Sequence, residues 1–456
     1  MLMIVPLVSG CAGFAPAPGD RGDIFPSRYS LYSTSREFSG AREEGAWWQG
    51  FKDPELNDLM ARALGKNFNI REAWARWDGA RALYQKQRSG FFPSLEGRGK
   101  YTGVDNHDTG GNETFSLGLG ASYEVDLWGR VAARVRVDQL EMEASRADLE
   151  AAANSVTASL AEQWIDLIAV RQEADLVRKQ IETNGALEDL LEFRFEKSIA
   201  SALDLLQQQK ALQQSQSRLP EILAREALLL NSMALLMGRP PGTDLGIRAR
   251  KFPPLPPLPP RGIPADLLAL RPDVRAAGLR LKSSDWEVAA SRADRLPALS
   301  ITAGLSYDGP TVSTLFDNWI ANLAGNLVGP IFDAGKKSAE VVRKRAQARE
   351  ELAAYERVVM PAIREVEDNL VGEIMQGKTL SLLDREIETN RRLFAEAERH
   401  YSRGLESYLP VVSALMGTQE LEITRVRRRA AYFKYRIGLY RSLGGAWTQD
   451  IPGRGK

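Results

Sequence analysis

The sequence predicts an α+β chain built from two copies of one unit, each with two strands and a very long helix. Three observations carry this prediction. Similar segments recur at one offset, several segments alternate apolar and polar residues, and a long stretch lacks proline. Each copy follows the order helix, two strands, very long helix, tight turn, helix. With 456 residues, the chain is long enough to bury a sizeable core.

The composition argues against several classes of site. Lys and Arg number 60 and Asp and Glu 59, a balance that speaks against a nucleic-acid partner. The chain has two histidines, His107 and His400, and one cysteine, Cys11. These counts exclude cysteine-based zinc sites, iron–sulfur clusters and internal disulfides, and they disfavour a histidine-based metal centre. We therefore predict no metal and no cofactor. No stretch reaches the roughly 18 apolar residues that a membrane-spanning helix needs.

The N-terminus is typical of a bacterial lipoprotein signal. An apolar run ends in Val8-Ser9-Gly10, directly before the only cysteine. We predict a signal over 1–10, lipidation of Cys11, and an extended tether over 11–46, which is rich in Gly, Pro, Ser and Arg. The run is short and no Lys or Arg precedes it, which leaves the true start of the signal open. The alternative is a frayed N-terminus with a buried free cysteine.

An internal duplication organises the rest of the chain. The tetrapeptide Ile-Glu-Thr-Asn occurs at 181–184 and again at 387–390, and other landmarks keep nearly this offset. We predict a first repeat over 47–240 and a second over 264–447, with a tail over 448–456. The proline-rich segment 241–263 joins the repeats and must be extended, because its prolines can neither continue a helix nor donate to a strand ladder. The matching segments are 92–95 with 296–299, 126–130 with 332–336, 195–201 with 401–407, and 236–238 with 442–444.

The first repeat begins with a helix over about 53–88. Asp53 is a suitable N-cap and Pro54 suits the first helical position, whereas Gly90 and Pro93 end the pattern.

Two strands follow in each repeat, over about 91–126 and 297–331. From Phe115 to Val125 apolar residues alternate with small or polar ones, and Leu299 to Tyr307 do likewise. The polar segments 102–113 and 308–318 are typical of hairpin loops. One solution packs the apolar face onto helices in a soluble protein. Another closes several copies into a membrane barrel, which the small polar face favours. Alternation alone leaves both open.

Very long helices come next. Residues 130–197 contain no proline and a coiled-coil-like apolar repeat, which predicts a helix of about 100 Å. Asn184 and its duplicate Asn390 fall on the seam. The second long helix, over 336–403, contains Pro361 and is expected to bend there. The shorter helices 53–88 and 203–238, stacked end to end, match the long one and predict one wall of a cylinder.

The chain resembles the TolC-type outer-membrane efflux channels, especially their lipoprotein branch (OprM- and NodT-like). The resemblance covers nearly the whole chain, and the order and spacing of its motifs make it specific. The matching segments are Trp47 to Leu56, Phe92-Pro93, Tyr123 to Arg130, Arg271 to Val274, Gly329 to Gly335, and Tyr401 to Leu409.

The resemblance implies a homotrimer in the outer membrane of a Gram-negative bacterium, lipid-anchored and extending into the periplasm. Each chain would give four strands to a twelve-stranded outer-membrane β-barrel and its long helices to a periplasmic α-helical barrel. The implied function is a passive exit duct of a tripartite efflux system. Its partners would be a periplasmic adaptor protein, an inner-membrane RND-type pump and outer-membrane lipid. The cargo is not implied, because selection lies mostly in the pump.

The same resemblance assigns roles to the two helical tips, at about 197–202 and 403–408. The adaptor-docking motif maps onto Ser198, Ile199 and Ala200 in the first tip, which lacks the usual glycine. In the second tip it maps onto Arg403, Gly404 and Leu405.

An aperture is expected beside the tips. Asp204 takes an acidic pore-facing position of the family, although it could equally cap a helix. Two further acidic positions of the family are occupied here by Pro410 and Ser413. Arg403 and Glu406 are expected either to link neighbouring subunits or to be ordinary solvated charges.

Rival functions are a soluble coiled-coil scaffold and a type I secretion exit duct. An enzyme is disfavoured, because the sequence has no nucleophile–base pair, metal-spaced cluster or phosphate loop.

Overall fold

The structure is a computed structural model that describes residues 46–105, 111–256, 258 and 270–444. Cys11 and His107 lie outside these residues. The chain divides into two compact units. The described part of the strand unit comprises 74–105, 111–148 and 275–358, and that of the hairpin unit comprises 46–73, 149–256, 258, 270–274 and 359–444.

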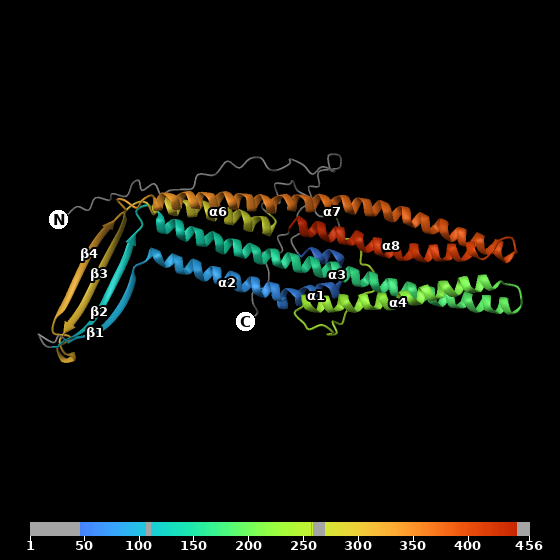
Figure 1. The fold of residues 1–456 in the computed structure, drawn as a ribbon, viewed down its shortest axis with the longest axis horizontal. Helices are drawn as coiled ribbons and strands as arrows, with labels where there is room; N and C mark the ends of the chain where they lie inside the picture. The colour runs from blue at the N-terminus through green and yellow to red at the C-terminus, as the bar shows by residue number, and fades with distance from the viewer. Residues whose placement is uncertain (1–45, 106–110, 257, 259–269, 445–456) are drawn as a thin grey trace. The chain divides into compact units, whose positions relative to one another are not determined.

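The described elements alternate long helices with two pairs of strands (Figure 1). Their order is a 3₁₀ turn at Trp47–Phe51, α1 (Pro54–Lys66), α2 (Phe68–Arg88), β1 (Ser94–Val104), β2 (Asn112–Val125), α3 (Arg130–Glu196), α4 (Ala202–Leu236), α6 (Pro272–Ala293), β3 (Ala298–Gly309), β4 (Trp319–Val328), α7 (Lys336–Ser402) and α8 (Leu409–Ser442). Both long helices are confirmed, with 67 residues each, and α7 continues through Pro361. None of the described helices has both the length and the apolar character needed to cross a membrane.

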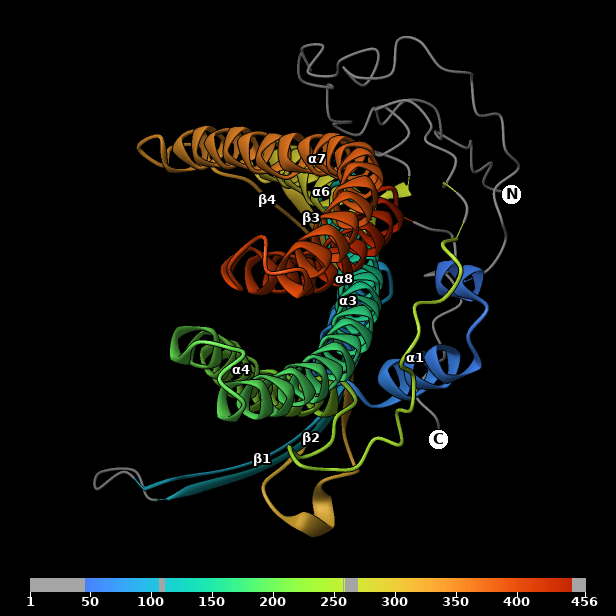
Figure 2. The ribbon, with the colours of Figure 1, turned by 90° about the vertical axis from the view of Figure 1, so that its right-hand side faces the viewer.

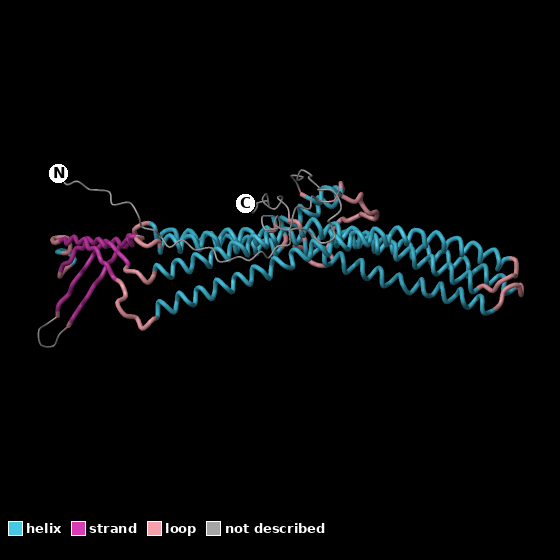
Figure 3. Tube along the Cα trace, turned by 90° about the horizontal axis from the view of Figure 1, so that it is seen from above, coloured by secondary structure: helices cyan, strands magenta, loops and turns pink. Residues whose placement is uncertain are grey.

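The four strands, magenta in Figure 3, form one antiparallel sheet. Their order in the sheet is β1-β2-β3-β4. In most rows of the sheet, the register places apolar residues on one face and small or polar residues on the other. Leu95, Ala121, Ala303 and Leu323 lie side by side on one face. The next row, on the opposite face, consists of Glu96, Gly120, Gly304 and Asn322. The period-two pattern of the sequence is therefore confirmed, with β1 extending to residue 104 and β2 beginning at 112, inside the expected loop.

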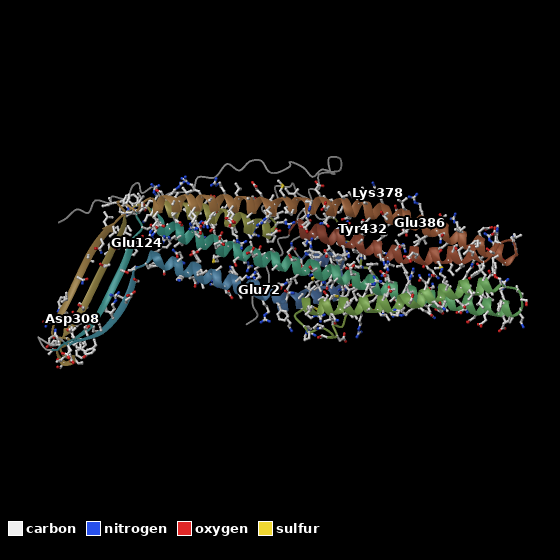
Figure 4. The ribbon with its side chains drawn as sticks, viewed as in Figure 1. Glu72, Glu124, Asp308, Lys378, Glu386 and Tyr432 are labelled. Atoms are coloured by element: carbon white, nitrogen blue, oxygen red, sulfur yellow. The ribbon has the colours of Figure 1, made fainter. Side chains whose placement is uncertain are left out.

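None of the described helices covers the apolar face of the sheet. Leu95 is 72% exposed and Leu323 78% exposed, and Figure 1 shows the sheet extending away from the helices of the strand unit. Charged side chains mark both ends of the polar face: Glu124 lies at the end near the helices and Asp308 near the opposite end (Figure 4). The arrangement contradicts the soluble alternative, in which helices would have covered the apolar residues.

The prediction of one helix over 53–88 is wrong, because this segment forms two helices, α1 and α2. The chain is extended at Asn67, between α1 and α2. The side-chain oxygen of Asn67 accepts hydrogen bonds from the backbone N–H groups of Asn69 (2.9 Å) and Ile70 (3.2 Å), which caps α2. Its Nδ2 donates to the carbonyl of Leu236 at 2.8 Å. The break therefore joins α2 to the end of α4. The start of α1 is as predicted, with Asp53 accepting from the N–H of Leu56 at 3.0 Å.

A joint of this kind occurs in both repeats, within the hairpin unit. Gly238 follows α4 with a φ of +65°, and a Cβ there would lie 2.3 Å from the carbonyl oxygen of Lys66. Gly444 follows α8 with a φ of +68°, and a Cβ there would lie 2.7 Å from the oxygen of Leu270. Only glycine fits both the conformation and the close approach. The start of α2 thus meets the end of α4, whereas the sequence predicted that one helix over 53–88 would stack on it.

The donor at the joint differs between the repeats. Asn67 bonds the carbonyl of Leu236 in the first, whereas Arg271 Nη1 donates to the carbonyl of Ser442 at 3.3 Å in the second. Arg271 also holds Asp273 (Nη2 to Oδ2, 2.7 Å) and Glu365 (Nη1 to Oε2, 2.8 Å). A charged cluster therefore replaces the amide in the second copy.

An aromatic cluster fixes the start of the described chain and the connector against α8. The ring of Trp47 stacks on Tyr440 with centroids 5.5 Å apart. Phe252, from the connector, stacks on Phe433 at 5.3 Å, and Phe51 lies 6.3 Å from the same ring. The proline-rich segment is thus bound to the helices of its own unit by side-chain packing.

Candidate functional site

The candidate site lies at the two helical tips, where α3 turns into α4 and α7 turns into α8. In the hairpin unit α4 lies beside α3 and α8 beside α7 (Figure 2). A left-handed residue makes each turn, Ser198 at φ +58° and Gly404 at φ +71°. The next N–H then bonds back to the helix: Ile199 to Arg194 (2.8 Å) and Leu405 to His400 (3.0 Å). The two tips thus share one turn, and Ser198 takes its strained conformation without a glycine.

Most residues of the expected docking motif are exposed. Ser198, Ile199, Arg403, Gly404 and Leu405 all point to solvent within one chain, whereas Ala200 is half-buried against the core of the hairpins. Ile199 and Leu405 occupy equivalent places on the two tips. An exposed branched apolar side chain at each tip is suited to contact with another protein.

Asp204 lies in the first turn of α4 and caps it. Its N–H donates to Ser201 Oγ at 3.1 Å, and its Oδ2 accepts from the N–H of Ser201 at 3.2 Å, which completes a capping box. The capping role considered from the sequence is thus present. The same Oδ2 also accepts a hydrogen bond from the hydroxyl of Tyr401 at 3.3 Å. Asp204 therefore links the tip of the first hairpin to the end of α7.

Two tyrosines surround this link. The ring centroids of Tyr401 and Tyr408 lie 5.1 Å apart, edge to face. The guanidinium of Arg194 lies 5.2 Å from the centroid of the Tyr401 ring. Burial, followed by the negative charge of Asp204, raises the pKa of Tyr401 above its ordinary value. Burial likewise raises the pKa of Tyr408. Both hydroxyls therefore stay protonated at neutral pH and can act as donors.

A buried polar network continues from Tyr408 into the hairpins. The Tyr408 hydroxyl donates to Gln208 Oε1 at 2.9 Å, and Gln208 Nε2 donates to the carbonyl of Asn184 at 2.8 Å. Asn184 Nδ2 donates to Ser215 Oγ at 2.8 Å, and Gln419 Nε2 donates to Asn184 Oδ1 at 3.3 Å. These five side chains are buried. They hold α8 to both α3 and α4.

The duplicated asparagine makes a more local set of bonds. Asn390 Nδ2 donates to the carbonyl of Ala414 at 2.8 Å and to Thr418 Oγ1 at 2.7 Å. Both partners belong to α8, the other half of the same hairpin. The seam position of both asparagines was predicted, but the reach of Asn184 into α8 was not.

The remaining predicted aperture residues stand apart from this network. Arg403 and Glu406 are both exposed in one chain. Local sequence patterns did not predict the roles of Gln208 and Tyr401 in this network. Gln208 lies in a run of three glutamines that looks solvated, and Tyr401 is 197 residues from its partner Asp204. Across the described residues no group of three or more His, Cys, Asp or Glu side chains could hold a metal ion.

Comparison with known proteins matches this chain to one protein family over most of its length. The model of the family described as "Outer membrane efflux protein" matches residues 59–239 and 263–445. "Pyoverdine export outer membrane protein OpmQ" of Pseudomonas aeruginosa is 30% identical, covering 98% of this chain and 96% of the relative. "Toluene efflux pump outer membrane protein TtgC" of Pseudomonas putida is 28% identical, over 92% and 89%. "Probable outer membrane lipoprotein SilC" of Salmonella typhimurium is 25% identical, over 97% of each.

Solved structures share the same fold. The outer-membrane channel OprN superposes with a TM-score of 0.87 at 25% identity, covering 95% of this chain and all of the other. CusC superposes with a TM-score of 0.85 at 23% identity, covering 95% and 99%. The helix and strand arrangement expected from the sequence is thus that of known outer-membrane channels.

Proposed function

Since the chain belongs to the outer membrane efflux protein family, we propose that three copies of it form the exit duct of a tripartite efflux system. The protein is an efflux channel of the outer membrane, and its family is one of channel proteins. What we propose beyond this is the trimer, its partners and its gate. The observation that carries it is the sheet, with one exposed apolar face and one small polar face.

The sheet supports closure between copies. Strands β1 and β4 are its two edges, and among the described residues of one chain neither has a second partner strand. Lipid cannot satisfy unpaired backbone groups, so a sheet that enters the membrane must close on itself. Four strands are too few to close alone, whereas three copies give twelve. The apolar face would contact lipid and the Gly, Ser, Thr and Asn face would line a water path.

The helices of the hairpin unit support the same ring. Exposed apolar side chains follow α4 and α7, the two helices that lie at opposite sides of the hairpin pair (Figure 2). They include Leu206, Leu228 and Leu235 on α4, and Met360, Met375, Leu382 and Leu393 on α7. The apolar rows on α4 and α7 consist of different residues, so a contact between them would join neighbouring copies head to tail. Such contacts can close into a ring of identical copies.

The tips would contact the periplasmic adaptor. Ile199 and Leu405 offer two equivalent apolar side chains, and Leu203 and Leu409 offer a second exposed pair one turn further along. A tip with paired apolar residues suits docking by helical tips of similar chemistry. The adaptor would connect the duct to an inner-membrane RND-type pump, which supplies the energy. The duct itself would be passive, with no catalysis.

Asp204 and Tyr401 would hold the resting aperture. Their hydrogen bond ties one hairpin to the other inside a single chain. Arg403 and Glu406, exposed in one chain, would be available to the neighbouring copy. The relatives are named for different cargoes, pyoverdine and toluene among them, which is consistent with selection by the pump rather than by the duct.

Lipidation of Cys11 is part of the proposal and lies outside the described residues. The predicted signal over 1–10 supports it, as does similarity to a relative that is named a lipoprotein. We propose that the lipid and the tether over 11–46 anchor each copy beside the sheet.

The test is the mass and conductance of the purified full chain. In lipid nanodiscs, native mass spectrometry should give three subunits, and planar bilayers should show channel conductance after reconstitution. A single subunit, or trimers without conductance under any voltage, would contradict the proposal.

A further inference from the structure

A groove between α4 and α8 combines an apolar floor with an excess of positive charge. It lies in the hairpin unit, above α3, and has a volume of about 490 Å³. We call it the arginine groove; it is lined chiefly by Val170, Glu173, Arg225, Leu228, Arg427 and Lys434. It lies well over 20 residues from the tip turns along α4, and none of the aperture residues lines it.

The charge excess arises because two arginines share one carboxylate. Glu173 is 2% exposed, and it accepts from Arg225 Nη2 at 2.7 Å and from Arg427 Nη2 at 3.0 Å. Arg427 Nε adds a further bond at 3.2 Å. Each guanidinium has five N–H donors, so several donors on both remain for a ligand. Because Arg225 is 43% and Arg427 51% exposed, those donors are accessible.

The other charges of the groove balance each other. Lys434 pairs with Asp166, with 3.0 Å between Nζ and Oδ1. The groove therefore keeps one net positive charge beside the two arginines. Val170 forms part of the buried floor, and the exposed side chain of Leu228 lies at the side. A cationic rim beside an apolar floor is complementary to a ligand with both characters.

We propose that the arginine groove binds amphipathic anions, with a carboxylate or sulfonate between Arg225 and Arg427 and an apolar body against Val170 and Ala431. Two guanidiniums can each donate to such a head group while they keep the bond to Glu173. On the proposed function, which this role rests on, the groove would be a point of contact for cargo along the duct. The binding itself does not depend on conductance.

Equilibrium dialysis of the full chain in a neutral detergent tests the binding. The probes are naphthalene-1-sulfonate and its uncharged counterpart naphthalene-1-methanol, with empty micelles as the blank. We expect saturable binding of the sulfonate. Arg427→Gln should weaken it about tenfold or more, as expected for loss of a charge-assisted hydrogen bond. Ala431→Asp, at a half-buried lining position of α8 outside the exposed α4 row, should weaken it strongly without removing an ion pair.

Arg218→Gln is the matched control. Arg218 also joins α4 to α8, through Glu420 at 2.8 Å, but it does not line the groove. The Arg218→Gln variant should lose much less affinity for the sulfonate than Arg427→Gln, because its partner Glu420 acts on the groove only through its charge near Arg427. Equal binding of the alcohol and the sulfonate would overturn the inference, as would an equal loss in Arg218→Gln and Arg427→Gln. A protein that binds the sulfonate but does not conduct would contradict the proposed duct and leave the groove as a ligand site.

Discussion

At the residue scale, Asp204 shows how one side chain can serve two purposes. Its place three residues after Ser201 is a helix-start signature that can be read from the sequence. Its contact with Tyr401 joins positions 197 residues apart, and no local pattern encodes such a contact. The cap was therefore predictable, whereas the link between hairpins needed the packed structure.

Two substitutions separate these purposes. Asp204→Asn keeps an oxygen that can accept from both Ser201 and Tyr401 but weakens both bonds by removing the charge, whereas Tyr401→Phe removes only the hydroxyl of the link. If the link holds the aperture, both variants should raise the resting conductance in planar bilayers with little change in unfolding midpoint. Asp204→Ala should in addition destabilise α4 by about 0.5–2 kcal/mol. Resting conductances equal to that of the parent in both of the first two variants would leave Asp204 as a cap alone.

Asp273 gives a pH prediction with a definite sign. Burial alone would raise the pKa of Asp273, but the hydrogen bond and charge of Arg271 outweigh it, and the pKa is lowered. A lowered pKa contributes stability above the unfolded value near 3.9, and this stability is lost as the pH falls through the folded pKa. Unfolding midpoints measured between pH 6 and pH 2.5 should fall less steeply in Asp273→Asn than in the parent. Parallel curves would contradict this contribution.

At the element scale, the helix expected over 53–88 shows where sequence patterning fails. Gly65 and Asn67 are residue types that often end or begin helices, but the polar and apolar spacing continues past them and favours a single helix. The break becomes favourable because Asn67 both caps α2 and bonds the last turn of α4, 169 residues away. Gly238, by contrast, was visible in the repeated segment 236–238, although its closeness to Lys66 was not.

Asn67→Ala should therefore cost more than an ordinary surface change. It removes the cap of α2 and leaves the carbonyl of Leu236 without this donor, so we expect about 1–3 kcal/mol of lost stability. Asn69→Ala, an exposed position in the same helix, is the control and should stay within about 0.5 kcal/mol. Chemical unfolding in detergent measures both. A loss in Asn69→Ala as large as that in Asn67→Ala would refute the role of the joint.

The sheet offers a comparison between adjacent residues. Leu119 lies on the apolar face of β2 and Gly120 on the polar face, where a Cβ would meet nothing within 4 Å. Leu119→Arg should reduce the stability of the inserted sheet by up to about 2–4 kcal/mol, because it sets a charge against lipid. Gly120→Arg should be tolerated. Both variants are folded into lipid vesicles, and denaturant titration then measures their stability. If Gly120→Arg lost more stability than Leu119→Arg, the assignment of the two faces would be reversed.

At the scale of the whole molecule, the duplication and the strand alternation were sufficient to predict the fold class. Alternation in Phe115 to Val125 assigns each residue to a face before any pairing is known. It could not decide whether helices cover Leu119 and its neighbours, because lipid and a protein core favour the same residues. The exposed Leu323 and Leu95 supply that answer, and they appear only once the sheet is seen beside the helices.

The two open edges of the sheet have a genetic consequence. If β1 of each copy must find β4 of another, a variant chain damaged at one edge will still be recruited through its intact edge. A cell that makes equal amounts of intact and damaged chains would then assemble only about one eighth of its threefold rings from intact copies alone. Alleles with edge defects in β1 or β4 should accordingly be dominant over the wild type, whereas alleles that prevent folding altogether should be recessive.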